Sequence, residues 1–356
     1  MFRRVLFVLT AASCLVGPGC APKSNFKYKV AVVPKGLTHE FWKSIERGAR
    51  RAAGDLTQQG ISVQILWDGP RKESDASDQI RIVQTLVGSR GANGLVLAPQ
   101  DSKAMVPVVE EVVQKGVPVV IIDSGLDKPD AFVKYVATDN YNGGRMAAKH
   151  LLDVLAKDGK AAPKLVLLRY AVGSESTEQR EKGFLDVVNE VIAQRKKAGQ
   201  PAPEVISDDV YAGATVDSSQ KVSGPLLIRV KDKADGIFAV NESAATGMLN
   251  EMRSQKLNGK IRLVAFDSSE PLLQAVEEGD VTGTIVQDPY RMGYLGVWVL
   301  VRHLEGDDVS DGGKKSLPTG EYLLTKENLK DEASRERFEP ALQAKRKIDP
   351  PEWKKK

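Results

Sequence analysis

The feature that most constrains the fold is a regular alternation of short apolar runs with amphipathic stretches, from residue 28 to residue 287. The runs are rich in Val, Ile and Leu, which is typical of parallel strands buried on both faces. The stretches between them repeat apolar residues at helical spacing. This alternation predicts βαβ units with right-handed crossovers, and therefore an α/β fold. The predicted strands are 29–33, 63–67, 94–98, 117–123, 164–170, 236–240, 261–266 and 281–287.

The number of strands predicts two lobes. About eight to ten strands are more than one doubly wound sheet of ordinary size holds, and 356 residues correspond to about two domains. No linker rich in Pro, Gly or Ser separates the halves, which indicates that the chain crosses between the lobes more than once. The pattern stops after Thr325. For the charged remainder, 326–356, we expect a surface helix followed by a loose tail.

The composition is that of an ordinary soluble globular protein, with 42% hydrophobic and 28% charged residues. The formal net charge is +4, and part of it comes from Arg3, Arg4 and the final three lysines. Because no basic stripe runs through the body of the chain, the charge gives little support for nucleic-acid binding.

The first 20 residues resemble a bacterial lipoprotein signal peptide. A basic start is followed by an apolar stretch, 5–16, that is too short to span a membrane. In such a signal Cys20 would be lipidated and would become the first mature residue. Gly17 stands where leucine is usual, and lipidation at Cys14 or ordinary cleavage are the alternatives. With no other cysteines in the chain, the mature domain has no internal disulfide.

Motifs for catalysis and for cofactor binding are missing. The three histidines, His39, His150 and His303, are far apart and have no metal-ligand spacing. There is no phosphate loop, dinucleotide fingerprint or nucleophile elbow. The segment 173–176 (GSES) follows a strand and is suited to position an anion or a hydroxyl, but no base partner is apparent. The sequence therefore argues against an enzyme, and we expect no catalytic residue, no cofactor and no metal.

Polar residues recur where apolar strands end or helices begin. Each one alone is explained more simply as a helix cap or turn former, and Asp139 and Asp267 are also candidates for caps. Together they are harder to explain in that way, because strand ends of an α/β sheet meet in one crevice. Their planar, bidentate groups suit the vicinal hydroxyls of a polyol. The set is Asp123, Asp139, Arg180, Asn241, Asp267 and Gln287.

Two adjacent aromatics, Phe41 and Trp42, follow the first strand and its polar turn. Taken alone they are explained more simply as core residues of the first helix. Set against the polar strand ends, at least one of them is better interpreted as a wall of a ligand cleft, because aromatic faces stack on the C–H faces of sugars.

The order of several short motifs along the chain resembles that of the periplasmic sugar-binding proteins of the ribose-binding type, the substrate-binding components of bacterial ABC importers. The resemblance runs from about Lys27 to Thr325 and rests on THEFWKSIERGA, VPVVIIDS, VATDNYNGG, STEQREKGF, FAVNE, LVAFDSS and IVQDPYRMG. It implies a periplasmic binding protein-like type 1 fold, with two doubly wound parallel-sheet α/β lobes joined by a three-strand hinge.

The resemblance also implies the domain boundaries. The N-terminal lobe is expected at 27–138 plus 288–320, the C-terminal lobe at 139–287 plus 321–330, and a charged tail at 331–356. The hinge crossings are expected near Thr138-Asp139, Asp267-Ser268 and Gln287-Asp288.

The same resemblance implies ligand-binding roles for residues of both lobes. Ser124 stands where ribose binders have an arginine, and His39-Glu40 stands where Asn-Pro is frequent, so a different pentose, a hexose, a polyol or a furanose-like signal is expected. Glu40 would suit an amine-bearing ligand, although a solvent-facing Glu in the first helical turn is the simpler explanation. The implied ligand-binding residues are His39, Phe41, Trp42, Asp123, Ser124, Asp139, Arg180, Tyr211, Asn241, Asp267 and Gln287.

The resemblance implies a monomeric, exported solute-binding protein, anchored by lipid in the periplasm or cell envelope. Hinge closure would capture a sugar or related polyol, which is then delivered to an ABC transporter permease. The alternative is the same clamp as the sensing subunit of a chemoreceptor or histidine kinase. A repressor core is disfavoured because a signal peptide stands where a DNA-binding motif would be. A sugar hydrolase or isomerase would need Asp123 and Asp267 about 5–10 Å apart.

Overall fold

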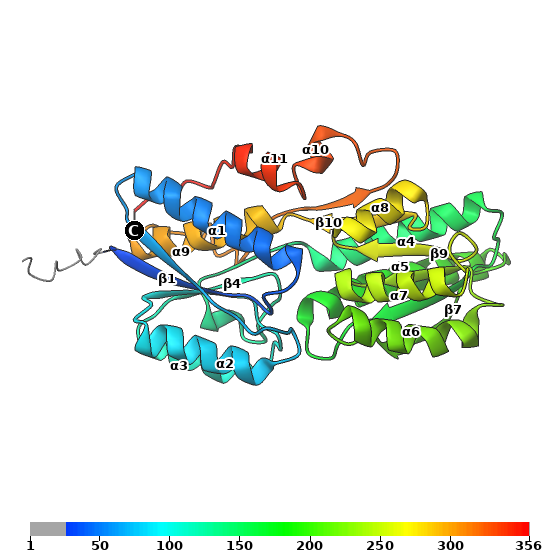
Figure 1. Ribbon diagram of the computed structural model, residues 1–356, viewed down its shortest axis with the longest axis horizontal. Helices are drawn as coiled ribbons and strands as arrows, with labels where there is room; N and C mark the ends of the chain where they lie inside the picture. Colours follow the sequence, from blue (N-terminus) through cyan, green and yellow to red (C-terminus); the bar gives the residue numbers. More distant parts are fainter. Residues whose placement is uncertain (1–25, 356) are drawn as a thin grey trace, which may run out of the picture.

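The computed structural model describes residues 26–355 as two α/β lobes, each built on a six-stranded sheet (Figure 1). The first sheet contains β1 (Tyr28–Val33), β2 (Val63–Trp67), β3 (Gly94–Leu97), β4 (Val119–Ile122), β5 (Lys134–Ala137) and β11 (Ser316–Pro318). The second contains β6 (Lys164–Arg169), β7 (Glu204–Tyr211), β8 (Gly236–Ala239), β9 (Arg262–Phe266), β10 (Gly283–Gln287) and β12 (Glu321–Leu324).

The two sheets have the same strand order. The first runs β11-β5-β4-β3-β1-β2 and the second runs β12-β10-β9-β8-β6-β7. All neighbours are parallel except the antiparallel pair β10–β12. Each strand of one lobe therefore has a counterpart in the other, and the predicted fold class of two parallel-sheet lobes is confirmed.

Helices cover both faces of each sheet, as the alternating pattern predicts. The first lobe carries α1 (Glu40–Gln58), α2 (Ala76–Gln84), η1 (Thr85–Ser89), α3 (Val106–Gln114), η2 (Pro129–Ala131) and α9 (Pro289–Leu304). The second carries α4 (Asn140–Lys157), α5 (Glu175–Lys197), α6 (Val216–Val230), α7 (Glu242–Ser254) and α8 (Glu270–Glu278). Two short helices follow, α10 (Glu332–Arg335) and α11 (Pro340–Lys345).

Between β1 and β12 the chain crosses from one lobe to the other three times: from β5 to α4, from β10 to α9, and from β11 to β12. The expected crossing at Asp267-Ser268 is wrong, because β9 and β10 on either side of it are neighbours in the second sheet. The remaining crossing instead lies at Thr319-Gly320, where Gly320 has a φ of 93° that favours glycine.

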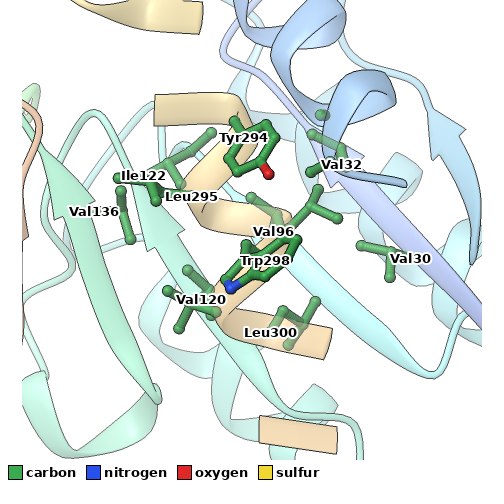
Figure 2. Close-up of a cluster of buried hydrophobic side chains, with 14 of the residues drawn as sticks. Val30, Val32, Val96, Val120, Ile122, Val136, Tyr294, Leu295, Trp298 and Leu300 are labelled. Atoms are coloured by element: carbon green, nitrogen blue, oxygen red, sulfur yellow. The ribbon is translucent and has the colours of Figure 1, made fainter. Parts of the chain in front are cut away.

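Burial on both faces explains why the strands are apolar at nearly every position. One face of the first sheet packs against α1 and α9, and Figure 2 shows its valines against the rings of Tyr294 and Trp298. The other face packs against α2 and α3. Each Val or Leu buried in this way contributes about 1.5–3 kcal/mol of transfer free energy.

Glycines allow two helix pairs to approach backbone to backbone. A Cβ on Gly144 in α4 would lie 2.0 Å from the carbonyl oxygen of Arg180 in α5. The equivalent contact in the first lobe is Gly293 of α9 against the carbonyl of Ile45 in α1, at 2.1 Å. The Gly143-Gly144 pair therefore serves packing, and it fixes the position of the helix that carries Arg180.

The C-terminal segment 326–355, which we call the strap, packs across both lobes and passes above them in orange and red in Figure 1. Phe338 joins an apolar cluster of the second lobe, and Trp353 packs against the core of the first. Arg346 forms an ion pair with the fully buried Asp288 at 2.5 Å. The expectation of a loose tail is wrong, because apolar residues too sparse to show a period still anchor the strap at both ends.

Within residues 26–355, none of the helices is long and apolar enough to cross a membrane. The predicted signal peptide, 1–20, and its lipidation site Cys20 lie outside the described residues.

Candidate ligand-binding cleft

A pocket with an empty volume of about 360 Å³, partly open to solvent, lies between the two lobes. Many of its walls come from the loops that follow the carboxyl ends of the strands, where open α/β sheets bind ligands. The lining residues are Lys35, His39, Phe41, Trp42, Glu73 and Asp123 from the first lobe, and Tyr170, Ser174, Ser176, Thr177, Arg180, Asn241, Glu242, Asp267 and Gln287 from the second.

Asp123 and Asp267 occupy equivalent positions, directly after β4 and β9. Both have a left-handed backbone, with φ of 63° and 72°, a conformation that aspartate tolerates better than most residues. The carboxylate of Asp123 pairs with the Lys35 ammonium at 3.2 Å. The carboxylate of Asp267 accepts hydrogen bonds from the Gln287 side-chain amide at 2.6 Å and from the backbone N–H of Glu242 at 3.0 Å.

The pKa of Asp267 is raised above its ordinary value because the carboxyl is buried, although the nearby Arg180 charge opposes the shift. The closest approach of the two charged groups is 4.0 Å, from Nη1 of Arg180 to Oδ2 of Asp267.

Glu73 joins three side chains at one corner of the pocket. It accepts hydrogen bonds from Trp42 Nε1 and from the hydroxyl of Tyr170, both at 2.6 Å, and it pairs with Nδ1 of His39 at 2.9 Å. Burial alone would raise the pKa of Glu73, but these partners outweigh it and lower the pKa to about 2. Burial alone would likewise lower the pKa of His39, but Glu73 raises it to about 9. The corner therefore holds an imidazolium–carboxylate pair at neutral pH.

The two aromatics of the first turn differ in burial. Their rings meet edge to face, with centroids 4.9 Å apart and planes at 89°. Trp42 is only 3% exposed and belongs to the core of the first lobe. Phe41 is half-buried, and both residues line the pocket. Trp42 is thus both a core residue and a pocket wall, while Phe41 is the more accessible ring face.

Arg180 is held on several sides. Its Nε donates to Asn140 at 2.9 Å, its Nη1 donates to the carbonyl of Val240 at 3.1 Å, and its guanidinium lies 3.8 Å from the ring centroid of Phe266. Nη2 has no hydrogen-bond partner among residues 26–355. A fixed guanidinium with free N–H groups at a pocket wall is preorganised to donate to ligand oxygens.

Glu242 is an acid without a cationic partner. It begins α7, and its carboxylate has no hydrogen bond or ion pair within the part of the chain that the structure describes. Burial raises its pKa to about 7, with the negative charges of Asp267 and Glu73 adding to the shift and His39 opposing it. Among residues 26–355, the pocket therefore contains the charge pairs Lys35–Asp123, His39–Glu73 and, at 4.0 Å, Arg180–Asp267, and Glu242 is its one acid outside an ion pair.

Direct bonds across the cleft show that the lobes are closed on each other. The Lys35 ammonium donates to the hydroxyls of Ser174 and Ser176, each at 3.2 Å. The backbone N–H of Ser176 donates to Ser124 Oγ at 3.1 Å. The Tyr170–Glu73 bond described above is a fourth hydrogen bond between the lobes. The GSES segment thus holds a lysine from the opposite lobe.

Eight of the predicted ligand-binding residues line the pocket: His39, Phe41, Trp42, Asp123, Arg180, Asn241, Asp267 and Gln287. Three do not. Ser124 is buried and accepts the interlobe bond from Ser176. Asp139 is exposed and caps α4 through the N–H of Asn142. Tyr211 ends the edge strand β7, and 44% of its surface is exposed on the outside of the second lobe.

Seven lining residues are outside the predicted ligand-binding set, although Ser174 and Ser176 belong to the GSES segment that the sequence marks as suited to position an anion or a hydroxyl. Two of the seven carry the strand-end signal that identified Asp123, because Tyr170 directly follows β6 and Lys35 lies two residues after β1. Glu242 follows Asn241 in the FAVNE motif. Glu73 lies in an irregular loop with no such signal. The full set is Lys35, Glu73, Tyr170, Ser174, Ser176, Thr177 and Glu242.

No group of three or more His, Cys, Asp or Glu among residues 26–355 is arranged to hold a metal ion.

Comparisons with known proteins agree with this geometry. Residues 30–308 match the family described as Periplasmic binding protein domain, and the chain belongs to this family. The D-ribose/D-allose-binding protein of Pseudomonas aeruginosa is 28% identical over 315 residues, which cover 85% of this chain and 92% of that protein.

Solved structures give the same result. A carbohydrate transporter solute binding protein from Agrobacterium radiobacter, in complex with D-arabinose, is 32% identical with a TM-score of 0.74, covering 87% of this chain and 98% of that chain. An ABC transporter solute binding protein from Agrobacterium vitis, with bound D-fucose, is 28% identical with a TM-score of 0.76, and the match covers 87% of this chain and 99% of that chain. The resemblance to periplasmic sugar-binding proteins is thereby confirmed.

Proposed function

We propose that this protein captures a sugar or related polyol between its lobes and delivers it to the permease of an ABC importer. The observation that carries the proposal is the composition of the pocket, which is lined by an accessible aromatic ring and by planar hydrogen-bonding groups from both lobes. Sugars need both, because their rings have C–H faces that stack on aromatics and edges lined with vicinal hydroxyls.

Each group has a role in this proposal. Phe41 provides the stacking face. Arg180 donates to ring oxygens or hydroxyls through the N–H groups that the protein leaves free, and Asn241 and Gln287 offer both donors and acceptors. Asp123 and Asp267 accept from hydroxyls at opposite ends of the ring.

Closure around the ligand is the proposed mechanism. A ligand that bonds to residues of both lobes binds the closed form better than an open one, and it shifts the population accordingly. The three crossings are the natural hinge, since they alone among residues 26–355 connect the lobes along the backbone apart from the strap. The ligand is released unchanged, and its delivery requires only reopening.

The family places the protein in the periplasm, and we infer in addition that Cys20 carries a lipid anchor and that the protein acts as a monomer. Mass spectrometry of the mature protein tests the anchor, because a lipidated Cys20 adds the mass of acyl chains to an N-terminus that begins at that residue.

A thermal-shift screen of residues 21–356 against pentoses, hexoses and polyols tests the proposed function. A ligand at 100 times its Kd stabilises the native state by about 2.7 kcal/mol, which is readily measured. Amino acids at the same concentrations serve as the control class. Stabilisation by amino acids but by no saccharide would contradict the proposal, and NMR of the released ligand would reveal any chemical change.

A further inference from the structure

The cleft does not end at the pocket described above, which we now call the first chamber. A second, partly open chamber adjoins it, and its volume of about 340 Å³ includes space that is open to solvent. Phe41, Glu242, Asp267 and Gln287 line both chambers. The second chamber is completed by Glu40, Ser44, Arg47, Ser268, Pro289, Arg337, Phe338 and Gln343.

The strap forms the outer wall of the second chamber through Arg337, Phe338 and Gln343. This wall is fixed to both lobes. Phe338 packs on the apolar cluster of the second lobe, and the side-chain oxygen of Gln343 accepts hydrogen bonds from Ser44 and Arg47 of the first lobe, each at 3.2 Å. Because Gln343 is only 1% exposed, its position is set by these bonds.

Several polar groups around the two chambers have no partner. Gln287 is 3% exposed, and its Oε1 accepts no hydrogen bond. The Arg337 guanidinium lies 4.8 Å from the ring centroid of Tyr322 and has no ion pair or hydrogen bond within residues 26–355, and its Nε is buried. Nε of Arg47 is also buried without a partner. Gln287 and Glu242 therefore supply acceptors where the two chambers meet. Arg47 and Arg337, which line only the second chamber, supply donors.

We propose that the second chamber is a subsite for a second sugar ring, so that the preferred ligand is a disaccharide or other glycoside. This inference rests on the proposed function, and it narrows the ligand class from sugars and polyols in general to molecules with two linked parts. The second chamber repeats the composition of the first, with aromatic faces from Phe41 and Phe338 among amide and guanidinium groups. At the junction, the side-chain oxygens of Gln287 and Glu242 accept hydrogen bonds from hydroxyls of the linked rings.

The strap lies outside the part of the chain that the family model matches, which ends at residue 308. The Agrobacterium structures are covered almost completely, by 98% and 99%, yet 87% of this chain is matched. The wall of the second chamber therefore comes from a segment that the family model does not include.

Titration calorimetry of residues 21–356 with α- and β-linked disaccharides and with their constituent monosaccharides tests the inference. We expect at least one disaccharide to bind about tenfold more tightly than either monosaccharide. Arg337→Gln should remove most of that tenfold advantage and leave monosaccharide affinity unchanged, since tenfold is what about one good hydrogen bond contributes. Arg335→Gln is the matched control, because Arg335 lies in the same segment but pairs with Glu339.

Phe338→Ala provides a second variant, with its melting temperature recorded because Phe338 also packs on the second lobe. It should selectively weaken the disaccharide in the same way. Disaccharides that bind no more tightly than monosaccharides, or an Arg337→Gln variant that weakens both equally, would overturn the second subsite and leave the sugar-binding function intact. Failure of every saccharide to bind would instead overturn the proposed function itself.

Discussion

The two lobes share one strand order but treat their equivalent aspartates differently. Asp123 is matched by a full positive charge from Lys35 at 3.2 Å. Asp267 is held by an amide and a backbone N–H, with the nearest guanidinium nitrogen 4.0 Å away. The same backbone position, with the same left-handed φ, thus carries a neutralised acid in one lobe and a less neutralised acid in the other.

This difference indicates a division of labour that the fold alone does not specify. In the first lobe, Lys35 and Glu73 use their charges to form the bonds that hold the closed state. In the second lobe, Asp267 and the free N–H groups of Arg180 remain available for a ligand. We therefore expect equivalent substitutions in the two lobes to have unequal effects.

The largest effect should come from Asp267→Asn. Asparagine has one acceptor oxygen, so its NH₂ group must face either the Gln287 amide N–H or the backbone N–H of Glu242, and both of these are donors. The substitution therefore removes one of the two hydrogen bonds together with the charge. We expect ligand affinity to fall by roughly 100-fold, within the 2–5 kcal/mol typical of a buried, bonded charge. Calorimetry with the ligand identified by the screen measures it.

Asp123→Asn is the matched comparison, because the Lys35 ammonium retains the hydroxyls of Ser174 and Ser176. A loss of about tenfold is expected there, which corresponds to the lower end of the roughly 1.5–3 kcal/mol that one charged hydrogen bond contributes. Equal losses in the two variants would show that the asymmetry between the lobes has no functional meaning.

The next effect concerns the glycines that let α4 pack on α5 and α9 pack on α1. Gly144→Ala and Gly293→Ala each place a Cβ about 2 Å from a carbonyl oxygen of the paired helix, and both should destabilise the protein by up to about 3 kcal/mol. Gly144→Ala acts on the backbone of Arg180 itself, whereas Gly293→Ala acts on Ile45, one helical turn after Phe41 in α1, so Gly144→Ala should weaken ligand binding more than Gly293→Ala does. Urea unfolding and calorimetry on both variants separate the two effects, and identical ligand affinities would contradict the role assigned to the α4–α5 contact.

Glu242 gives a prediction about pH. Its folded pKa of about 7 is above the ordinary glutamate value of 4.5, so the folded state holds the proton more tightly than the unfolded state does. The neutral carboxyl therefore stabilises the fold fully below pH 4.5, and this contribution is lost as the pH rises through 7. Glu242→Gln keeps the neutral form and should be more stable than the wild type by about 2 kcal/mol at pH 8, with little difference at pH 4.5.

Urea unfolding at pH 4.5, 6, 7 and 8 measures the trend. The control is Glu270→Gln, which changes the same residue type at the first position of α8, where the side chain is exposed. A stability difference for Glu242→Gln that does not change with pH would contradict the prediction.

The sequence predicts the architecture well, because burial on both faces leaves a direct apolar pattern in the strands. It also predicts the strand-end residues that line the pocket, since the carboxyl ends of parallel strands converge. Tyr211 shows the limit of that rule: β7 is an edge strand, and its end lies on the outer surface. Glu73 and the strap have no periodic pattern, because loops and irregular segments are positioned by contacts between residues distant in sequence.

Trp42 is where the sequence leaves two interpretations open, and its substitution gives the smallest predicted effect. Trp42→Phe keeps an aromatic ring in the core but removes the N–H that donates to Glu73 at 2.6 Å. We expect a stability loss of about 1–2 kcal/mol. Trp298→Phe is the control, because Trp298 lies in the same core and its buried N–H has no partner to lose. If Trp42 were only a core residue, the two variants would lose similar stability. Because its N–H also fixes Glu73, which bonds Tyr170 across the cleft, Trp42→Phe should in addition weaken ligand binding, and Trp298→Phe should not.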